Sequence, residues 1–337
     1  MIRAAINGFG RIGRNILRAL YESKYRKKIV VTAINEITKS KSIAYLLKYD
    51  STHGVFPLDV SLKNNLLFVA NDIIYIFNYS KIKEVPWEKF NIDIVLDCTG
   101  IYGTKEDGIC YLKNGIKKVL FSHLGEENLD NTVIYGVNEK TLNDNHKIVS
   151  NGSCTTNCII PVIKILDKNF KIKSAIATVI HPMMNDQSIL DNYNADLRKT
   201  RSSIQSIIPI STKLKEGVIR VCPKFKNNFD AISLRVPTIN VTGIDLSVLV
   251  KNKSTVSQVN KVLKHYSKTT YKNIVSYNEL PLVSVDFNHN SYSSIIDSTQ
   301  TKVSGDYLIK VFVWCDNEWG FANRMLDTAI FMISKKI

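Results

Sequence analysis

The chain is poor in the residues that build extracellular, fibrous or membrane-spanning proteins. Its 337 residues include 6 Cys, 8 Pro and 15 Gly. A collagen-like chain is excluded by this composition, and so few cysteines in so long a chain indicate no disulfide framework. No CxxC pair and no Cys/His set with zinc-ligand spacing occurs, so we expect no metal site. No apolar run approaches the roughly 18 residues that a membrane span requires, so we expect no membrane partner.

Acidic residues are also scarce relative to basic ones. The 45 Lys and Arg exceed the 30 Asp and Glu, giving a formal net charge of +15. The basic residues are mostly Lys, and they are dispersed singly or in pairs, whereas nucleic-acid surfaces usually cluster their charge and favour Arg. A basic nucleic-acid-binding protein therefore stays only a remote alternative, and the charge favours small anionic substrates. The first residues enter a strand-like run directly, which predicts no cleavable leader and a cytoplasmic location.

Strands alternate with helices in the N-terminal half of the chain. Apolar runs predict buried strands at residues 2–7, 29–35, 92–97 and 118–122, and an apolar helical period follows the first strand over 14–23. Alternating strands and helices are typical of a doubly wound α/β sheet, because a parallel connection needs a crossover. We expect a Rossmann dinucleotide-binding domain over residues 1–152.

A glycine-rich turn joins the first strand to the first helix. The candidate phosphate-binding residues are Gly8, Phe9, Gly10, Arg11, Ile12 and Gly13. Glycines at this spacing permit a tight turn and a close approach of the backbone to a diphosphate at the helix N-terminus. Glu36 ends the second strand, where a carboxylate accepts hydrogen bonds from ribose hydroxyls and repels a 2′-phosphate, so NAD is favoured over NADP. The alternative is a tight turn without a ligand.

The pattern changes beyond about residue 153. A helix is predicted over 155–168, and β-prone runs follow at 174–181, 231–236, 244–250 and 307–314. These long runs suit an antiparallel sheet, so an α+β catalytic domain is expected over residues 153–319. A last helix over 320–337 is expected to rejoin the first domain.

A cysteine and a histidine in this second region are candidate catalytic residues. Cys154 lies at the predicted start of a helix, where the helix dipole is expected to lower the thiol pKa and favour the nucleophilic thiolate. His181 ends a predicted strand, and a Cys and a His that share a pocket act as nucleophile and base. A structural thiol and a core histidine are the alternative. Cys158, one turn further along the helix, is interpreted as a buried filler.

Several basic, hydroxyl and amide side chains are candidate ligands for an anion or a cofactor. The basic and hydroxyl group comprises Arg198, Arg201, Thr212, Lys213 and Arg235. A planar guanidinium suits phosphate, although ordinary solvated surface is the alternative for all of them except Arg235. Arg235 lies inside an apolar run, where an unpaired charge is costly, so an anionic partner is expected. Asn317, at a predicted strand-to-helix turn, could hold a carboxamide, and a turn that only packs domains is the alternative.

Together these strings resemble the glyceraldehyde-3-phosphate dehydrogenases. The resemblance rests on residues 6–14 (INGFGRIGR), 48–54 (KYDSTHG), 150–158 (SNGSCTTNC), 234–238 (LRVPT) and 314–320 (WCDNEWG), and it covers nearly the whole chain. It implies that Cys154 is the catalytic thiol, His181 the base and Asn317 a ligand of the nicotinamide amide. It also implies a homotetramer, NAD as cofactor, and cofactor contacts from Thr99 and Ser122. Ser153 and Thr155, beside the thiol, are assigned to the substrate together with Arg198, Thr212, Lys213 and Arg235.

The sequence departs from the usual family pattern near these residues. His181-Pro-Met-Met184 replaces His-Ser-Tyr-Thr, Ser211-Thr-Lys213 replaces Ser-Thr-Gly, and Glu36 replaces an Asp. Such changes resemble the sister branch, the D-erythrose-4-phosphate dehydrogenases. That branch implies NAD-dependent oxidation of an aldose phosphate to 4-phosphoerythronate, a precursor in pyridoxal phosphate synthesis, with water as the acyl acceptor. A phosphorylating glycolytic dehydrogenase is the alternative.

Overall fold

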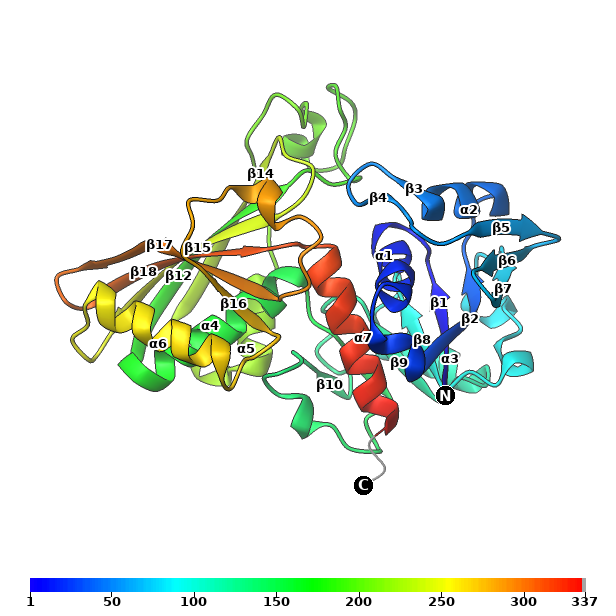
Figure 1. Ribbon diagram of the computed structural model, residues 1–337, viewed down its shortest axis with the longest axis horizontal. Coiled ribbons are helices and arrows are strands. Elements are labelled where there is room, and N and C mark those ends of the chain that lie inside the picture. Colours follow the sequence, from blue (N-terminus) through cyan, green and yellow to red (C-terminus); the bar gives the residue numbers. More distant parts are fainter. Residues whose placement is uncertain (335–337) are drawn as a thin grey trace. The chain divides into compact units, whose positions relative to one another are not determined.

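The computed structural model describes residues 1–334 and divides into two compact units. Unit 1 contains residues 1–153 and the segment from Phe321 onward, and unit 2 contains residues 154–320. Figure 1 shows a sheet with helices in each unit. Of the C-terminal helix expected over 320–337, the last three residues lie outside the described part of the chain.

Unit 1 is built on a nine-stranded sheet in the order β10-β11-β9-β8-β1-β2-β7-β6-β5. The pairs from β10 to β7 are parallel, and β6 and β5 join antiparallel at one edge. Its strands are β1 (Ile2–Asn7), β2 (Ile29–Asn35), β5 (Val60–Lys63), β6 (Leu66–Val69), β7 (Asp72–Phe77), β8 (Ile94–Asp97), β9 (Lys118–Phe121), β10 (Asn131–Thr132) and β11 (Ile148–Ser150), with a separate hairpin of β3 (Tyr49–Asp50) and β4 (Gly54–Val55). The strand order reverses at β1, between β2 and β8, which is where doubly wound sheets bind ligands at their carboxyl edge.

The helices of unit 1 connect and cover these strands. They are α1 (Arg11–Tyr21), α2 (Ser40–Lys48), α3 (Lys105–Lys113) and α7 (Trp319–Ser334), with 3₁₀ turns η1 (Lys24–Lys27), η2 (Ile82–Glu84), η3 (Trp87–Phe90) and η4 (Glu139–Thr141). Inward-facing residues of five strands pack against Trp87 and Tyr111 in one apolar cluster. The end of α7 is tied into this unit, because Thr328 Oγ1 donates to Asn151 Oδ1 and Lys118 Nζ donates to the carbonyl of Met332.

Unit 2 contains a seven-stranded sheet in the order β13-β14-β12-β15-β18-β17-β16. Its strands are β12 (Ile172–Pro182), β13 (Ile208–Ile210), β14 (Phe229–Val236), β15 (Thr242–Val250), β16 (Val275–Asn278), β17 (Ser294–Ser304) and β18 (Leu308–Cys315). Four of the six pairs are antiparallel, and β12–β14 and β16–β17 are parallel. The mainly antiparallel character expected from the sequence is therefore confirmed.

Three helices pack on the sheet of unit 2. They are α4 (Cys154–Phe170), α5 (Leu214–Val221) and α6 (Val256–Lys268), with 3₁₀ turns η5 (Leu197–Thr200), η6 (Pro223–Phe225) and η7 (Ser284–Phe287). Most of α4 is buried, and Pro161 lies inside the helix without ending it. The pleat of β12 buries Ala175, Ala177 and Val179 while Ile176 on the other face is 55% exposed.

The structure contains neither a membrane-spanning helix nor a metal-binding cluster within residues 1–334. None of the described helices combines the length and the apolar character needed to cross a bilayer. Over the same residues, no group of three or more His, Cys, Asp and Glu side chains is placed to hold a metal ion.

Candidate functional site

The glycine-rich turn lies at the carboxyl end of β1 and begins α1. Gly8 has φ +84°, and a Cβ there would lie 2.6 Å from the backbone nitrogen of Thr99. At Gly13 a Cβ would lie 2.3 Å from the carbonyl oxygen of Gly8, whereas the space beside Gly10 is open to 4 Å. Gly10 is also the N-cap of α1 and supplies no side-chain acceptor. The turn therefore leaves a close approach to the helix N-terminus, which suits a diphosphate.

Glu36 lies beside this turn, as its position after the second strand predicts. Its Oε2 accepts a hydrogen bond from the backbone N–H of Phe9 at 2.7 Å, and its own N–H donates to the carbonyl of Phe77. The half-buried carboxylate is thus anchored within the glycine-rich turn. It has the place and the charge to accept ribose hydroxyls and to repel a 2′-phosphate.

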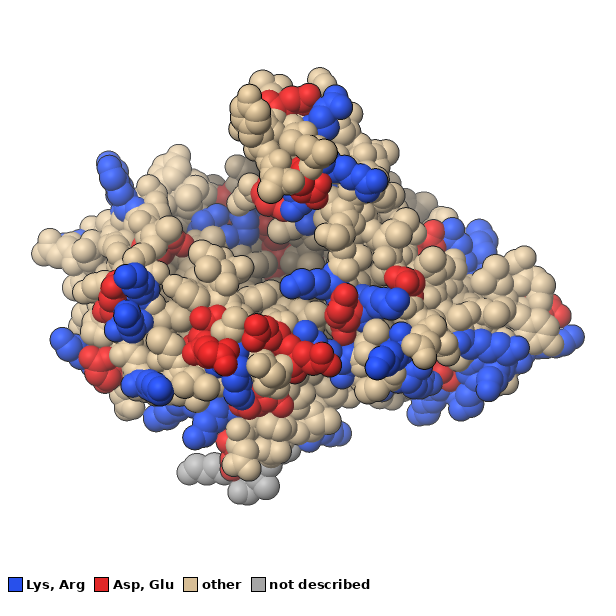
Figure 2. All heavy atoms as spheres, turned by 180° about the vertical axis from the view of Figure 1, so that it is seen from behind, with Lys and Arg blue, Asp and Glu red and all other residues tan. Residues whose placement is uncertain are grey.

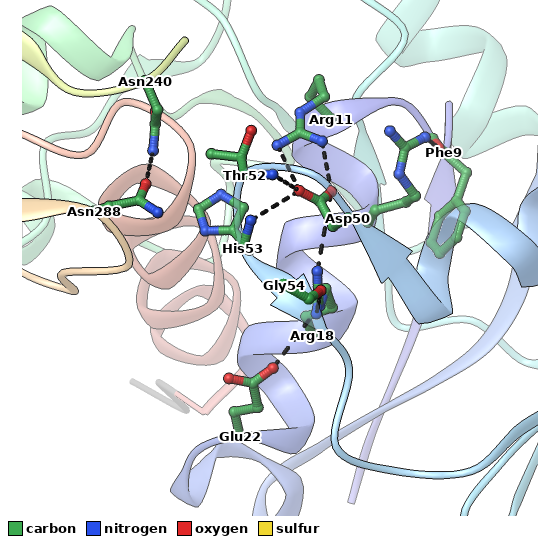
Figure 3. Close-up of polar contacts among 11 residues, drawn as sticks. Phe9, Arg11, Arg18, Glu22, Asp50, Thr52, His53, Gly54, Asn240 and Asn288 are labelled. Carbon is green, nitrogen blue, oxygen red and sulfur yellow. Dashed lines mark hydrogen bonds and ion pairs between the residues drawn. The ribbon is translucent and has the colours of Figure 1, made fainter. Parts of the chain in front are cut away.

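A buried ion pair fixes the loop at 49–54 to α1. Figure 3 shows Arg11, Thr52 and His53 converging on Asp50, with Arg18 nearby. Arg11 donates to Asp50 at 2.5 and 3.2 Å, and the backbone N–H groups of Thr52 and His53 donate to it at 2.9 and 3.0 Å. Burial alone raises the pKa of Asp50, but the Arg11 and backbone hydrogen bonds outweigh it and lower the pKa to about 2. The carboxylate of Asp50 therefore balances the charge of the Arg11 guanidinium and holds it beside the turn.

A buried polar network lies under the carboxyl edge of the sheet. Asn7 donates to Tyr111 Oη at 2.5 Å and to Asp97 at 3.2 Å, and Asn35 donates to Asn7 Oδ1 at 2.8 Å. Burial raises the pKa of Asp97 and, together with the charge of Asp97, that of Tyr111. The network ties β1, β2 and β8 together directly beneath the glycine-rich turn.

The two further residues assigned to the cofactor by resemblance also lie at this edge. The hydroxyl of Thr99 donates to Asp97 at 2.7 Å and accepts from the N–H of Ile101 at 3.1 Å, so it already closes its own turn. Ser122 follows β9, and its N–H donates to the carbonyl of Asp97 at 2.9 Å. Both residues lie at the carboxyl edge of the sheet. Because the Thr99 hydroxyl is engaged in its own turn, Thr99 has only backbone groups available for a cofactor.

In unit 2, the structure brings the two candidate catalytic residues together. Cys154 is the first residue of α4 and His181 the penultimate residue of β12. The Sγ atom of Cys154 lies 3.9 Å from Nε2 of His181. Cys154 is half-buried and His181 is 7% exposed. The distance suits proton transfer between thiol and imidazole once a substrate draws the two groups together.

The expected lowering of the thiol pKa at the helix N-terminus is wrong for this structure. Burial, with Cys315 nearby, raises the pKa of Cys154 to about 12 despite backbone hydrogen bonds to the sulfur. Burial and the positive charge of Arg235 lower the pKa of His181 to about 4. At neutral pH the pair is therefore a thiol and a neutral imidazole, because desolvation outweighs the dipole.

Arg235 lies beside His181 because the two residues are register partners on the parallel strands β12 and β14. Its Nη1 is 2.7 Å from His181 Nδ1 and 3.1 Å from the carbonyl oxygen of Pro182. Burial lowers the pKa of Arg235, while Asp186 and Cys154 oppose this. Its buried Nε has no hydrogen-bond acceptor. The sequence-based expectation that an anion belongs at Arg235 has a geometric basis here.

The remaining substrate candidates lie on elements that surround β14. Arg198 in η5 is exposed and donates to the carbonyl of Pro209 on β13. Pro209 follows Ile208, which is the register partner of Arg235 on β14. Thr212 accepts from the N–H of Leu214 at 3.2 Å, and the exposed Lys213 is the N-cap of α5. Arg201 is exposed and paired with Asp191 at 2.9 Å. Arg201 therefore has the role of an ordinary solvated surface residue, which was the alternative for it.

The last two substrate candidates flank Cys154 in sequence, Ser153 just before α4 and Thr155 in its first turn. Ser153 is half-buried and Thr155 is 8% exposed. One residue further, Thr156 lies against Gly217 of α5, where a Cβ would be 2.5 Å from its Oγ1. The start of α4 is thereby held against α5, whose N-cap is Lys213.

Asn317 follows β18 and is oriented by a residue that sequence reasoning missed. The hydroxyl of Thr242, which is fully buried, donates to Asn317 Oδ1 at 3.2 Å. With its oxygen engaged, Asn317 presents its NH₂ donors, which match the carbonyl oxygen of a carboxamide. No local pattern signals Thr242, because its partnership depends on the pairing of β15 with β18.

Basic and acidic side chains are interspersed on the face drawn in Figure 2. Across the described chain, whichever face they lie on, some basic side chains form ion pairs, such as Lys215–Asp230, Lys264–Glu279 and Lys310–Asp245. The dispersion seen in the sequence therefore recurs on this face.

Two family models match the chain. The model for the glyceraldehyde 3-phosphate dehydrogenase NAD binding domain matches residues 2–105. The model for the C-terminal domain of the same enzymes matches residues 153–317. Together they cover most of the chain and include the glycine-rich turn, Cys154, His181, Arg235 and Asn317.

Proposed function

Because the chain belongs to the glyceraldehyde 3-phosphate dehydrogenase family and carries its NAD-binding domain, we propose that it oxidises D-erythrose 4-phosphate to 4-phosphoerythronate. The observation that carries the reaction type is the 3.9 Å approach of Cys154 Sγ to His181 Nε2. A nucleophilic thiol with an adjacent base is the arrangement that covalent oxidation of an aldehyde requires.

The proposed reaction begins when Cys154 Sγ adds to the aldehyde carbon. Nε2 of His181 takes the thiol proton and gives it to the carbonyl oxygen, which becomes the hydroxyl of a thiohemiacetal on Cys154. Bound NAD supplies the acceptor for the hydrogen and electron pair that leave the carbon. His181 takes the hydroxyl proton in that step and releases it to solvent, and the carbon is left as a thioester of Cys154.

Water then releases the acid from Cys154. The oxygen of water adds to the thioester carbon while His181 accepts its proton, and the carbon–sulfur bond breaks. His181 then gives this proton to the sulfur, which restores the thiol. Arg235 is proposed to hold the substrate phosphate, with Arg198, Thr212 and Lys213 contributing from η5 and the start of α5. Its half-buried guanidinium and unpartnered Nε support this role.

The choice of erythrose phosphate rests on the two segments that depart from the phosphorylating pattern. Pro182 and Met184 follow the base in place of hydroxyl residues, and Lys213 stands where a glycine is usual. A phosphorylating enzyme acting on glyceraldehyde 3-phosphate is the second candidate, favoured by the family that both domain models describe.

Initial rates of NADH formation with both aldehydes, each with and without inorganic phosphate, separate the two candidates. We expect a higher kcat/KM for D-erythrose 4-phosphate and no requirement for phosphate. Phosphate-dependent turnover that prefers the triose would refute the proposed substrate. The Cys154→Ser variant supplies the background rate.

We also propose that the protein is a homotetramer, as members of its family are expected to be. Ile176 and Ile232 lie on the same face of neighbouring strands and are 55% and 54% exposed. An exposed apolar sheet face is costly in a monomer, and a second copy would cover it symmetrically. The double variant Ile176→Lys/Ile232→Lys should lower the mass measured by light scattering. A monomeric wild type would end this proposal.

A further inference from the structure

Three polar groups at the end of β12 form a triangle whose contacts conflict. Nδ1 of His181 is 2.8 Å from the carbonyl oxygen of Pro182. Nη1 of Arg235 is 2.7 Å from the same Nδ1 and 3.1 Å from the same oxygen. The guanidinium can only donate, the carbonyl can only accept, and Nδ1 does one or the other.

No placement of protons satisfies all three contacts. If Nδ1 carries a proton, two N–H groups face each other between Arg235 and His181. If Nδ1 carries its lone pair, two acceptors face each other between His181 and Pro182. While the guanidinium stays at 2.7 Å, it donates to Nδ1, and the neutral ring therefore carries its proton on Nε2.

The location of that proton decides what His181 can do. Nε2 is the ring atom that faces Cys154, at 3.9 Å from Sγ. A protonated Nε2 on a neutral ring has no lone pair and cannot take a proton from the thiol. The base is competent only when Nδ1–H donates to Pro182 and Nε2 is bare, which requires Arg235 to withdraw.

The surroundings of Arg235 favour such a withdrawal when an anion is present. Its buried Nε lacks an acceptor where the side chain now lies. Among the described residues, no carboxylate lies within ion-pair distance of its guanidinium, and the nearby Asp186 is paired with Lys199. An anion would supply the missing acceptors and release Nδ1 from the conflict.

We propose that Arg235 couples anion binding to the tautomer of His181: a substrate phosphate draws the guanidinium away from Nδ1, and the proton moves from Nε2 to Nδ1. The base is thus switched on by the phosphate of the molecule it acts upon. This inference rests on the proposed function. Arg235 acts here as a positioning residue for His181, in addition to any contact it makes with the substrate.

Nitrogen NMR of the [¹⁵N]histidine-labelled full chain tests the coupling, with inorganic phosphate as the probe. The chain has 6 His, and the His181→Asn variant identifies the signals of His181 by their loss. Near pH 7 without phosphate, we expect the protonated-nitrogen shift at Nε2. Saturating phosphate should exchange the shifts of the two nitrogens, and sodium chloride at equal ionic strength should not. An unchanged tautomer with phosphate bound overturns the proposal.

Two variants separate coupling from a general effect of charge. In Arg235→Gln the protonated nitrogen should be Nδ1 with or without phosphate. Lys310→Gln removes the same charge from a half-exposed lysine that pairs with Asp245, and it should retain the full phosphate response. A phosphate response that persists in Arg235→Gln contradicts the coupling. If that variant does not fold, the wild-type titration still decides.

The readout needs neither an aldehyde nor NAD, so its failure is distinct from failure of the proposed function. A phosphate-switched tautomer in a protein that does not oxidise erythrose phosphate would leave the coupling standing. Oxidation of erythrose phosphate with a fixed tautomer would leave the function standing and remove the coupling.

Discussion

The ion pair between Asp50 and Arg11 is expected to stabilise unit 1 by an amount that depends on pH. The carboxylate is 2% exposed, and its pKa in the fold is about 2 against an ordinary value of 3.8. A difference of this size corresponds to roughly 2–2.5 kcal/mol at neutral pH. Because the folded pKa is depressed, the stabilisation is complete above about pH 4 and is lost as the pH falls towards about 2.

The variant Asp50→Asn removes this charge and leaves Arg18, which is 1% exposed, with Glu22 at 3.9 Å but without the Asp50 carboxylate at 4.0 Å. Scanning calorimetry of the ligand-free chain at pH 6 should show a loss of about 4–8 °C in the Tm of the transition assigned to unit 1. The difference from wild type should shrink between pH 4 and pH 2. Hydrogen exchange should locate the loss at the amides of Thr52 and His53, which donate to the carboxylate.

A matched substitution on an exposed pair provides the control. Asp230 pairs with Lys215 at 2.9 Å, but its side chain is 64% exposed. Asp230→Asn should therefore change stability by no more than about 0.5 kcal/mol. Equal losses in the two variants, or a deficit in Asp50→Asn that persists unchanged to pH 2, would refute the argument from burial.

Further predictions concern the chemistry. Cys154→Ser should abolish turnover, and His181→Asn should lower kcat by about 10²–10⁴-fold while Cys154 is still alkylated slowly by iodoacetamide; full-rate oxidation by the serine variant would contradict the mechanism. Thr242→Val should weaken NAD binding, measured by calorimetric titration, because Asn317 loses the hydroxyl that orients its amide; an unchanged Kd would exclude that role. Glu36→Ser should raise the affinity for NADP relative to NAD, and an unchanged ratio would show that the carboxylate does not face the ribose.

The sequence predicted the elements well wherever an apolar period was local. The strands at 2–7 and 29–35 have the predicted bounds, and α4 begins one residue before the predicted helix. The first helix begins at Arg11 rather than at 14, because the glycine-rich turn itself forms the first helical turn. Boundaries of this kind depend on how the turn is packed, which periodicity does not encode.

In the candidate site, too, the sequence predicted the features that local motifs mark and missed those that depend on packing. Cys154 and His181 could be selected from their motifs, and the packing of α4 on β12 places Sγ 3.9 Å from Nε2. The pKa of Cys154 could not be inferred, because a helix N-terminus is visible in a sequence but the burial of a sulfur atom is not. Asp50 and Thr242 were missed for a related reason. Their partners come from distant strands and helices, so no local spacing marks them.

The direction of the two pKa shifts also constrains how the chemistry starts. A thiol with a pKa of about 12 next to an imidazole with a pKa of about 4 does not form an ion pair at rest, because each shift opposes the charged form. The proton must therefore leave Cys154 as the bond to the aldehyde carbon forms, and it needs a bare Nε2 to receive it. While Arg235 donates to Nδ1, the ring proton stays on Nε2 and no lone pair is available there. The lone pair appears when an anion binds the guanidinium and draws it away from Nδ1. Protection of the thiol and activation of the base then depend on the same event, the arrival of a phosphorylated substrate.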